Sequence, residues 1–241
     1  MFIDVHCHLD SNYYNDIDKV INNAKKNNVN KLIYNGCNKK SNKEVIKLIN
    51  KYDSVYGAVG YHPTELDDVN EKDYELLESL LNNKKIVAIG EIGLDYHYPD
   101  TNKEKQKYAF RRQLELAEKH NIPVIVHSRD AIQDTFDIMS EYNIKGVIHC
   151  FSGSVEMAKE FIKKGFLISI GGIITFKNAK NIIEVIKNID LSYILLETDS
   201  PYLTPEPFRK EQNEPMYIPI IASKIADILN VSIEEVSSKT T

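Results

Sequence analysis

Short apolar runs alternate with amphipathic segments along the whole chain. Eight of the apolar runs have the length of a β-strand. Runs such as VIVH and ILLE are continuous rather than alternating, which is typical of parallel strands covered by helices. The predicted strands lie at residues 2–9, 31–37, 55–62, 86–95, 123–129, 145–152, 166–172 and 194–201.

Segments with helical periodicity follow each of these strands. They lie at residues 18–27, 41–52, 70–82, 101–120, 130–142, 154–164, 178–189 and 217–230. Eight strand–helix alternations in 241 residues give about 30 residues per unit, which is the size of a βα unit. The pattern predicts an α/β protein with a single (β/α)8 TIM-type barrel over residues 1–241. A doubly wound open sheet is the competing interpretation.

Several helix boundaries carry their own signals. Ser41 with Glu44 and Thr101 with Glu104 have the spacing of capping boxes. Gly165 follows two lysines, as expected of a residue that ends a helix. A further helix begins at Ser232 and is short, so we expect an extra C-terminal helix after the eighth βα unit.

Composition excludes some classes of protein without naming a function. Thirty basic and 35 acidic residues give a net charge of −5, which argues against broad adhesion to nucleic acid or to anionic membranes. An enzyme that holds phosphate through metal ions is still compatible with this charge. The three cysteines form no Cys-x-x-Cys pair, and the sequence shows no signal peptide and no apolar stretch of about 20 residues. We expect a cytoplasmic protein without membrane association. The oligomeric state is left open, and a monomer is compatible with the sequence.

Metal-competent residues lie at the carboxyl ends of the predicted strands, where barrel enzymes build their active sites. Imidazole and carboxylate groups suit divalent first-row metals, and a carboxylate can bridge two ions. Six such residues supply enough ligands for two ions that activate a water for hydrolysis. These predicted ligands are His6, His8, Glu91, His127, His149 and Asp199.

Two further acids share a strand face with predicted ligands. Asp4 alternates with His6 and His8, and Glu197 alternates with Asp199. Acids below metal ligands often orient them, so both are candidates for that role. A structural ion pair inside the barrel is the alternative.

Five motifs together resemble the TatD family of metal-dependent deoxyribonucleases, which belongs to the amidohydrolase-like barrels. In chain order they are FIDVHCHLD, GEIGLDYH, PVIVHSRDA, HCFSG and LLETDSPYL. The resemblance covers essentially the whole chain. It implies the six ligands given above, with Glu91 bridging two divalent ions drawn from Zn, Mg, Mn, Co or Fe.

The resemblance also implies roles for individual residues. Glu91, Asp199 and His62 are the expected catalytic residues, with Asp199 holding or deprotonating the attacking water and His62 contacting the scissile phosphate. Arg129 is a further expected substrate contact, and Arg209 and Asn213 lie in the PEPFRKEQNEP segment that is expected to reach the substrate.

The resulting hypothesis is a deoxyribonuclease that cleaves DNA phosphodiester bonds by a metal-activated water, acting as a 3′–5′ exonuclease on single strands, with DNA as a transient partner. One alternative keeps the two-metal site but hydrolyses another ester or amide, such as an aminoacyl-tRNA ester. A second alternative is a metal-binding scaffold without turnover.

Overall fold

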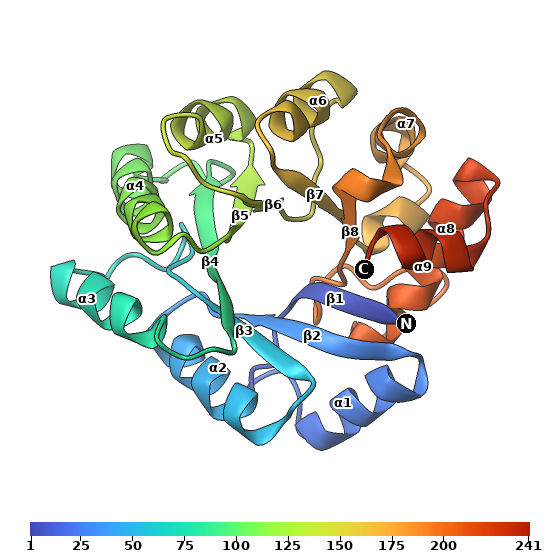
Figure 1. Ribbon diagram of the computed structural model, residues 1–241, viewed down its shortest axis with the longest axis horizontal. Coiled ribbons are helices and arrows are strands. Elements are labelled where there is room, and N and C mark those ends of the chain that lie inside the picture. Colours follow the sequence, from blue (N-terminus) through green and yellow to red (C-terminus); the bar gives the residue numbers. More distant parts are fainter. The chain divides into compact units, whose positions relative to one another are not determined.

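The computed structural model describes residues 1–241, and eight parallel strands alternate in it with helices (Figure 1). In the sheet the strands follow one another in sequence order, from β1 to β8. A doubly wound sheet reverses its strand order, so that alternative is wrong and the predicted (β/α)8 fold class is confirmed. The strands are β1 Phe2–Cys7, β2 Val29–Asn35, β3 Val55–Val59, β4 Ile86–Asp95, β5 Val124–Arg129, β6 Gly146–Ile148, β7 Leu167–Ile170 and β8 Ile194–Leu196.

Nine α-helices follow or connect these strands. They are α1 Ile17–Lys26, α2 Lys39–Lys51, α3 Glu71–Leu80, α4 Lys103–His120, α5 Ile132–Met139, α6 Val155–Lys163, α7 Lys180–Asn188, α8 Ile218–Leu229 and α9 Ile233–Lys239. Three short 3-10 helices are η1 Gly172–Thr175, η2 Leu191–Tyr193 and η3 Pro215–Tyr217. The predicted extra C-terminal helix is α9, and the Ser232 side chain caps it by accepting a hydrogen bond from the Glu235 amide.

The chain forms two compact units. The first comprises Met1–Tyr34 with His149–Thr241, and the second comprises Asn35–Ile148. In the first unit α8 packs on β1, β8 and α9. The chain after β8 also pairs with the end of β1, because the Asp199 amide donates to the His6 carbonyl at 2.9 Å and the His8 amide to the Ser200 carbonyl at 2.8 Å. These two bonds bring the ends of the first and last strands together.

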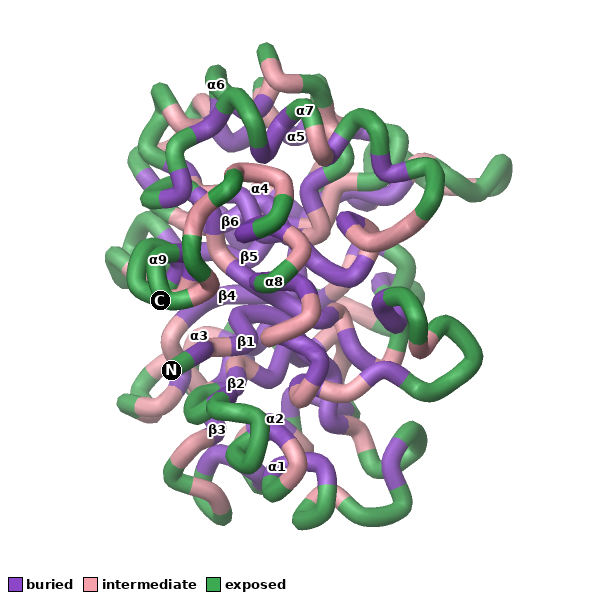
Figure 2. Tube along the Cα trace, turned by 90° about the vertical axis from the view of Figure 1, so that its right-hand side faces the viewer, coloured by how far each residue is buried: buried purple, intermediate pink, exposed green.

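In the second unit, β3 to β6 form a parallel run, with β4 paired to both β3 and β5. Helices α2, α3, α4 and α5 lie on one side of these strands (Figure 1). The strands are largely buried, whereas the helices expose their outer faces (Figure 2). Gly93 has a φ of +140°, and a Cβ there would lie 2.0 Å from the His127 carbonyl oxygen, so only glycine lets β4 and β5 approach this closely.

Two predicted capping boxes are wrong by a few residues. Helix α2 is capped by Asn38, and Ser41 is the third residue of that capping box rather than its first. Helix α4 is capped by Asn102, whose side chain accepts from the Lys105 amide at 3.0 Å. Asparagine caps a helix as well as serine does and better than threonine, and here it lies nearer the true start of each helix. Lys164 caps α6, and Gly165 follows it with a φ of +90°, as the sequence predicts.

The strands β6 and β8 are shorter than predicted. Cys150 has a φ of +45° and Asp199 a φ of +54°, so the backbone leaves the extended conformation just after each strand. His149 and Asp199 therefore lie in tight turns beyond the strand ends and not on the strands themselves.

Candidate metal centre

In the first unit the ends of β1 and β8 bring three candidate ligand side chains together. The Nε2 atoms of His6 and His8 are 3.2 Å apart, and Oδ1 of Asp199 lies 3.5 Å from the first and 3.6 Å from the second. His149 stacks on His6 with ring centroids 3.9 Å apart, and it forms a metal-competent group with His6 and Asp199. We call His6, His8, His149 and Asp199 the β1/β8 cluster.

The spacing of these atoms suits a metal ion. Nitrogen and oxygen ligands at about 2.0–2.2 Å from one ion in tetrahedral geometry lie about 3.3–3.6 Å from each other. The separations of 3.2, 3.5 and 3.6 Å in the β1/β8 cluster are close to this range. Imidazole nitrogens and a carboxylate oxygen are also the donors that zinc and related divalent ions prefer, so the residues fit such an ion.

Asp199 is ionised at neutral pH. Burial by itself would raise the pKa of its carboxyl group, but a hydrogen bond from His8 and the charges of His149 and His6 outweigh burial, and the pKa lies below its ordinary value. The left-handed backbone at Asp199 is a conformation that few residues other than glycine adopt, although aspartate tolerates it better than most. Strain of this kind is concentrated at functional sites.

The carboxylate of Glu197 lies beside His149 and the turn that follows it. Its carboxylate accepts hydrogen bonds from the Cys150 amide, at 2.7 Å, and from the Ser169 hydroxyl, and Oε1 lies 3.6 Å from Nδ1 of His149. It therefore holds the strained turn at Cys150, and its carboxylate faces the neighbouring imidazole. The orienting role that the sequence suggests for this acid stays a prediction.

Asp4 makes different contacts from those of Glu197. It accepts hydrogen bonds from the amide and the hydroxyl of Thr198, at 3.0 and 2.5 Å, and from the amide of His6 at 3.2 Å. Burial raises the pKa of its carboxyl group to about 8, against the effect of these hydrogen bonds. Asp4 thus joins the backbone at the ends of β1 and β8.

In the second unit a further group forms at the ends of β3, β4 and β5. Oε1 of Glu91 lies 3.0 Å from Nδ1 of His127 and 3.5 Å from Nε2 of His62, and the three residues form a second metal-competent group. We call them the β3–β5 cluster. Glu91 is 3% exposed and its other oxygen accepts from the Cys37 thiol at 3.5 Å. A buried carboxylate facing two imidazoles also fits a divalent ion.

Hydrogen bonds on the far side of each imidazole fix its orientation. Nδ1 of His62 accepts from the Thr64 amide at 3.2 Å, which places the proton of a neutral ring on Nε2 and makes that atom a donor. Nε2 of His127 lies 3.2 Å from Oδ2 of Asp95, so its Nδ1 is the atom turned toward Glu91. His62 is thereby suited to donate to an anion, and His127 to ligate.

Asp95 is the residue that sequence reasoning missed. The charge of His127 and hydrogen bonds from His127 and the His97 amide overcome the effect of burial, and the pKa of Asp95 lies below its ordinary value. The signal was present, because Asp95 lies four residues after Glu91 on the same face of β4.

The predicted substrate contacts occupy varied positions. Arg129 is exposed, with its guanidinium 5.9 Å from the centre of the Tyr98 ring. Arg209 stacks on Phe176 at 4.0 Å and donates to the Thr204 carbonyl at 2.9 Å. Asn213 is fully buried, and its amide nitrogen donates to the carbonyls of Thr198 and Tyr202 at 2.8 and 2.5 Å. Its side chain therefore holds the loop after β8 in place.

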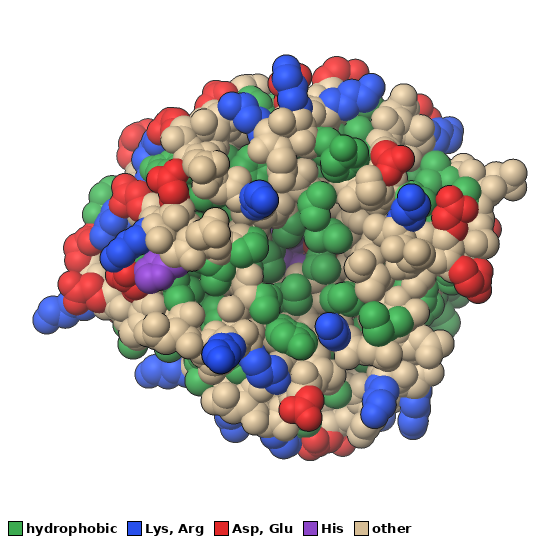
Figure 3. All heavy atoms as spheres, viewed as in Figure 1, with side chains coloured by type: hydrophobic (Ala, Val, Ile, Leu, Met, Phe, Trp, Pro, Cys, Tyr) green, Lys and Arg blue, Asp and Glu red, His purple; other side chains and the backbone are tan.

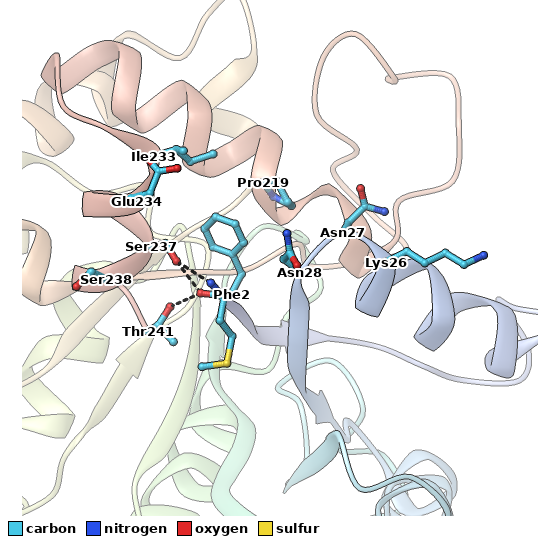
Figure 4. A pocket seen from close by; sticks show the side chains of 11 residues that line it. Phe2, Lys26, Asn27, Asn28, Pro219, Ile233, Glu234, Ser237, Ser238 and Thr241 are labelled. Carbon is cyan, nitrogen blue, oxygen red and sulfur yellow. Dashed lines mark hydrogen bonds between the residues drawn. The ribbon is translucent and has the colours of Figure 1, made fainter.

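A pocket of about 730 Å³ lies elsewhere in the first unit (Figure 4). It is lined by the start of β1, the α1–β2 connection and α9, and the Met1 carbonyl there accepts hydrogen bonds from Ser237 and Thr241. Phe2 in this pocket precedes His6 by four residues, or about 13 Å of extended strand. The pocket is thus separate from the β1/β8 cluster.

The sequence matches the family of TatD related DNases over residues 3–241. The chain belongs to this family. Metal-dependent hydrolase YabD of Bacillus subtilis, described as uncharacterized, is 41% identical over 245 residues, which cover 100% of this chain and 96% of YabD. Metal-dependent hydrolase MJ1582 of Methanocaldococcus jannaschii, also described as uncharacterized, is 37% identical over 239 residues. These residues cover 98% of this chain and 92% of MJ1582. The crystal structure of YJJV, a TatD homolog from Escherichia coli, superimposes with a TM-score of 0.94 at 30% identity, covering 99% of this chain and 94% of YJJV.

These matches make the chain a metal-dependent hydrolase of the TatD family, with histidine and carboxylate clusters that could bind metal. No single helix is both long and apolar enough to cross a membrane; Pro215–Leu229 and Ile233–Lys239 meet the criterion only as a pair, bent by 109°. The face drawn in Figure 3 mixes basic and acidic side chains and shows no broad basic patch.

Proposed function

We propose that this TatD-family hydrolase is a deoxyribonuclease that cleaves phosphodiester bonds, removing nucleotides from the 3′ ends of single-stranded DNA. The observation that carries the proposal is the convergence of His6, His8 and Asp199, whose facing atoms are 3.2–3.6 Å apart at the meeting ends of β1 and β8. Family membership supports the reaction class, since the family is described as TatD related DNase. DNA is then a transient substrate. The proposal treats residues 1–241 as one hydrolase domain and places it in the cytoplasm, where its three free cysteines would stay reduced.

Two divalent ions are part of the proposal, one held by each cluster, with identities among Zn, Mg, Mn, Co and Fe. His6, His8, His149 and Asp199 would hold one ion, and Glu91 and His127 the other. Bound ions of this kind acidify water and neutralise charge on phosphoryl oxygens.

The protein's own residues have separate tasks. Asp199, ionised at neutral pH, accepts the proton of the attacking water at its carboxylate. Nε2–H of His62 donates to a phosphate oxygen, because Thr64 holds the other nitrogen as an acceptor. Arg129 and Arg209 are exposed cations that would contact the DNA backbone, and Asn213 positions the loop that carries Arg209.

The experiment compares wild type with Glu91→Gln, using Glu75→Gln on exposed α3 as the matched control. Metal-loaded proteins are assayed on a single-stranded oligodeoxynucleotide, on a small phosphodiester and on an aminoacyl ester. We expect wild type and Glu75→Gln to cleave the oligonucleotide and Glu91→Gln to lose at least 100-fold in rate, as removal of a key catalytic group does. Full activity of Glu91→Gln, or turnover of the ester alone, would overturn the proposal.

A further inference from the structure

Two exposed tyrosines lie beside the β1/β8 cluster in the first unit. Tyr202 is 49% exposed and Tyr13 is 40% exposed, although both rings are large and apolar. The Tyr202 ring centroid lies 6.3 Å from that of His8, at an interplanar angle of 68°. Exposed aromatic surface next to a polar site is typical of a surface that binds a ligand.

The two rings are held rigidly relative to each other. They meet edge to face with centroids 5.8 Å apart and an interplanar angle of 73°, and their hydroxyl oxygens are 2.6 Å apart. The pair therefore presents a preorganised surface and loses little conformational entropy when a ligand binds.

The loops that carry these tyrosines are also fixed from behind. The Gln212 side chain donates to the Tyr13 carbonyl at 2.8 Å, and the buried Tyr14 hydroxyl donates to the Asn213 carbonyl at 2.5 Å. The Tyr202 amide donates to the Asp199 carbonyl at 2.9 Å, which places the ring one turn after a candidate metal ligand. The position of the ring is thus coupled to the position of that ligand.

We propose that Tyr13 and Tyr202 form a platform on which a nucleobase of the substrate stacks while the adjoining phosphate lies at the β1/β8 cluster. The proposal rests on the proposed function, because it identifies the substrate of that site as a nucleotide. Stacking on an aromatic ring tolerates every base, since each base has a π face. It gives an acidic protein a way to hold single-stranded DNA without a basic groove.

The test measures binding rather than turnover. Metal-loaded protein is titrated calorimetrically with 2′-deoxyadenosine 5′-monophosphate and with 2-deoxyribose 5-phosphate, which share the phosphate and sugar and differ in the base. One stacked base contributes about 5- to 150-fold in affinity. We expect wild type to bind the nucleotide at least about tenfold more tightly than the sugar phosphate.

Four variants separate stacking from loop structure. Tyr202→Phe keeps the ring and should retain the preference for the nucleotide, whereas Tyr202→Leu should reduce the preference to about twofold or less. Tyr193→Leu is the matched control, because Tyr193 is also exposed in the first unit but lies before β8, away from the cluster. Tyr13→Leu should weaken the preference for the nucleotide as well. It replaces Tyr202→Leu as the test variant if Tyr202→Leu does not fold.

Equal affinity of wild type for the two ligands would overturn the platform, as would a Tyr202→Leu variant that weakens both ligands equally. Oligonucleotide cleavage by a wild type that binds the nucleotide and the sugar phosphate equally well contradicts the platform and leaves the proposed nuclease function standing. A preference for the nucleotide without cleavage of any oligonucleotide supports the platform and contradicts the proposed nuclease function.

Discussion

Nε2 of His127 lies 3.2 Å from Oδ2 of Asp95, and this contact decides which nitrogen of His127 faces Glu91. A carboxylate behind a ligating histidine fixes the ring, selects its tautomer and raises its basicity. Asp95 also accepts from the His97 amide at 2.9 Å, so its own position is held by the backbone. It positions a candidate ligand and lies outside the set of ligands itself.

Replacing Asp95 by asparagine should weaken metal binding without unfolding the protein. Asp95→Asn keeps the size of the side chain and an acceptor for the His97 amide, but it removes the charge behind His127. Loss of such a partner costs about 10- to 100-fold in metal affinity. Competition with a chromogenic chelator measures the affinity, with Asp53→Asn on the exposed surface as the control. Unchanged affinity in Asp95→Asn would show that His127 does not depend on this contact.

Glu197 should matter for stability as well as for His149. Glu197→Gln turns an amide group toward one of the two donors, the Cys150 amide or the Ser169 hydroxyl, and leaves it without an acceptor in a fully buried site. The free energy of unfolding should fall by about 1–3 kcal/mol. Urea titration measures the loss, and Ser169→Ala should lose less because it removes a donor and leaves no buried donor without an acceptor. Equal stability of Glu197→Gln and wild type would contradict this account of the turn.

Asn213→Ala should loosen the loop after β8. The substitution leaves the carbonyls of Thr198 and Tyr202 without their donor, at a cost of about 1–3 kcal/mol in unfolding free energy. Limited proteolysis should then cut residues 200–213 faster than in wild type. The control is Asn188→Ala, which removes an exposed amide bonded to the Glu184 carbonyl. If both variants resist the protease like wild type, the buried amide is not what holds the loop.

Asp4 predicts a specific dependence of stability on pH. Burial raises the pKa of its carboxyl group to about 8 from an ordinary value of 3.8, so between these values the folded protein keeps a proton that the unfolded chain releases. The contribution of Asp4 to stability is therefore complete below about pH 4 and is lost as the pH rises toward 8, by up to about 1.4 kcal/mol per pH unit.

Asp4→Asn, which cannot titrate, should remove this part of the slope. Denaturant unfolding of the metal-free proteins at pH 5, 6, 7 and 8 measures the difference. A difference between wild type and Asp4→Asn that stays constant across these pH values would show that Asp4 is ionised throughout.

Much of the fold could be predicted from the pattern of apolar residues along the chain. The fourth strand was predicted with the bounds that the structure gives, Ile86–Asp95, because it is a continuous apolar run without an early turn. The sixth and eighth strands were predicted too long. Their pattern continues through Cys150 and Asp199, while the backbone turns there through left-handed conformations that hydrophobicity does not encode.

The candidate ligands could be predicted for a chemical reason, since only a few residue types bind metal and they follow strand after strand. The contacts that support these ligands could not be predicted from the sequence. The pairing of Asp95 with His127 and of Glu197 with Cys150 depends on ring rotation and turn geometry, which single-residue spacing leaves undetermined. The same holds for Tyr13 and Tyr202, which are 189 residues apart in the chain and share a hydrogen bond.

The most direct test of the central claim is the product pattern from a single-stranded oligodeoxynucleotide labelled at its 5′ end. Metal-loaded wild type should shorten it one nucleotide at a time from the 3′ end, and a chelator should stop the reaction until a divalent ion is restored. An oligonucleotide that stays intact with each of Zn, Mg, Mn, Co and Fe would contradict the assignment.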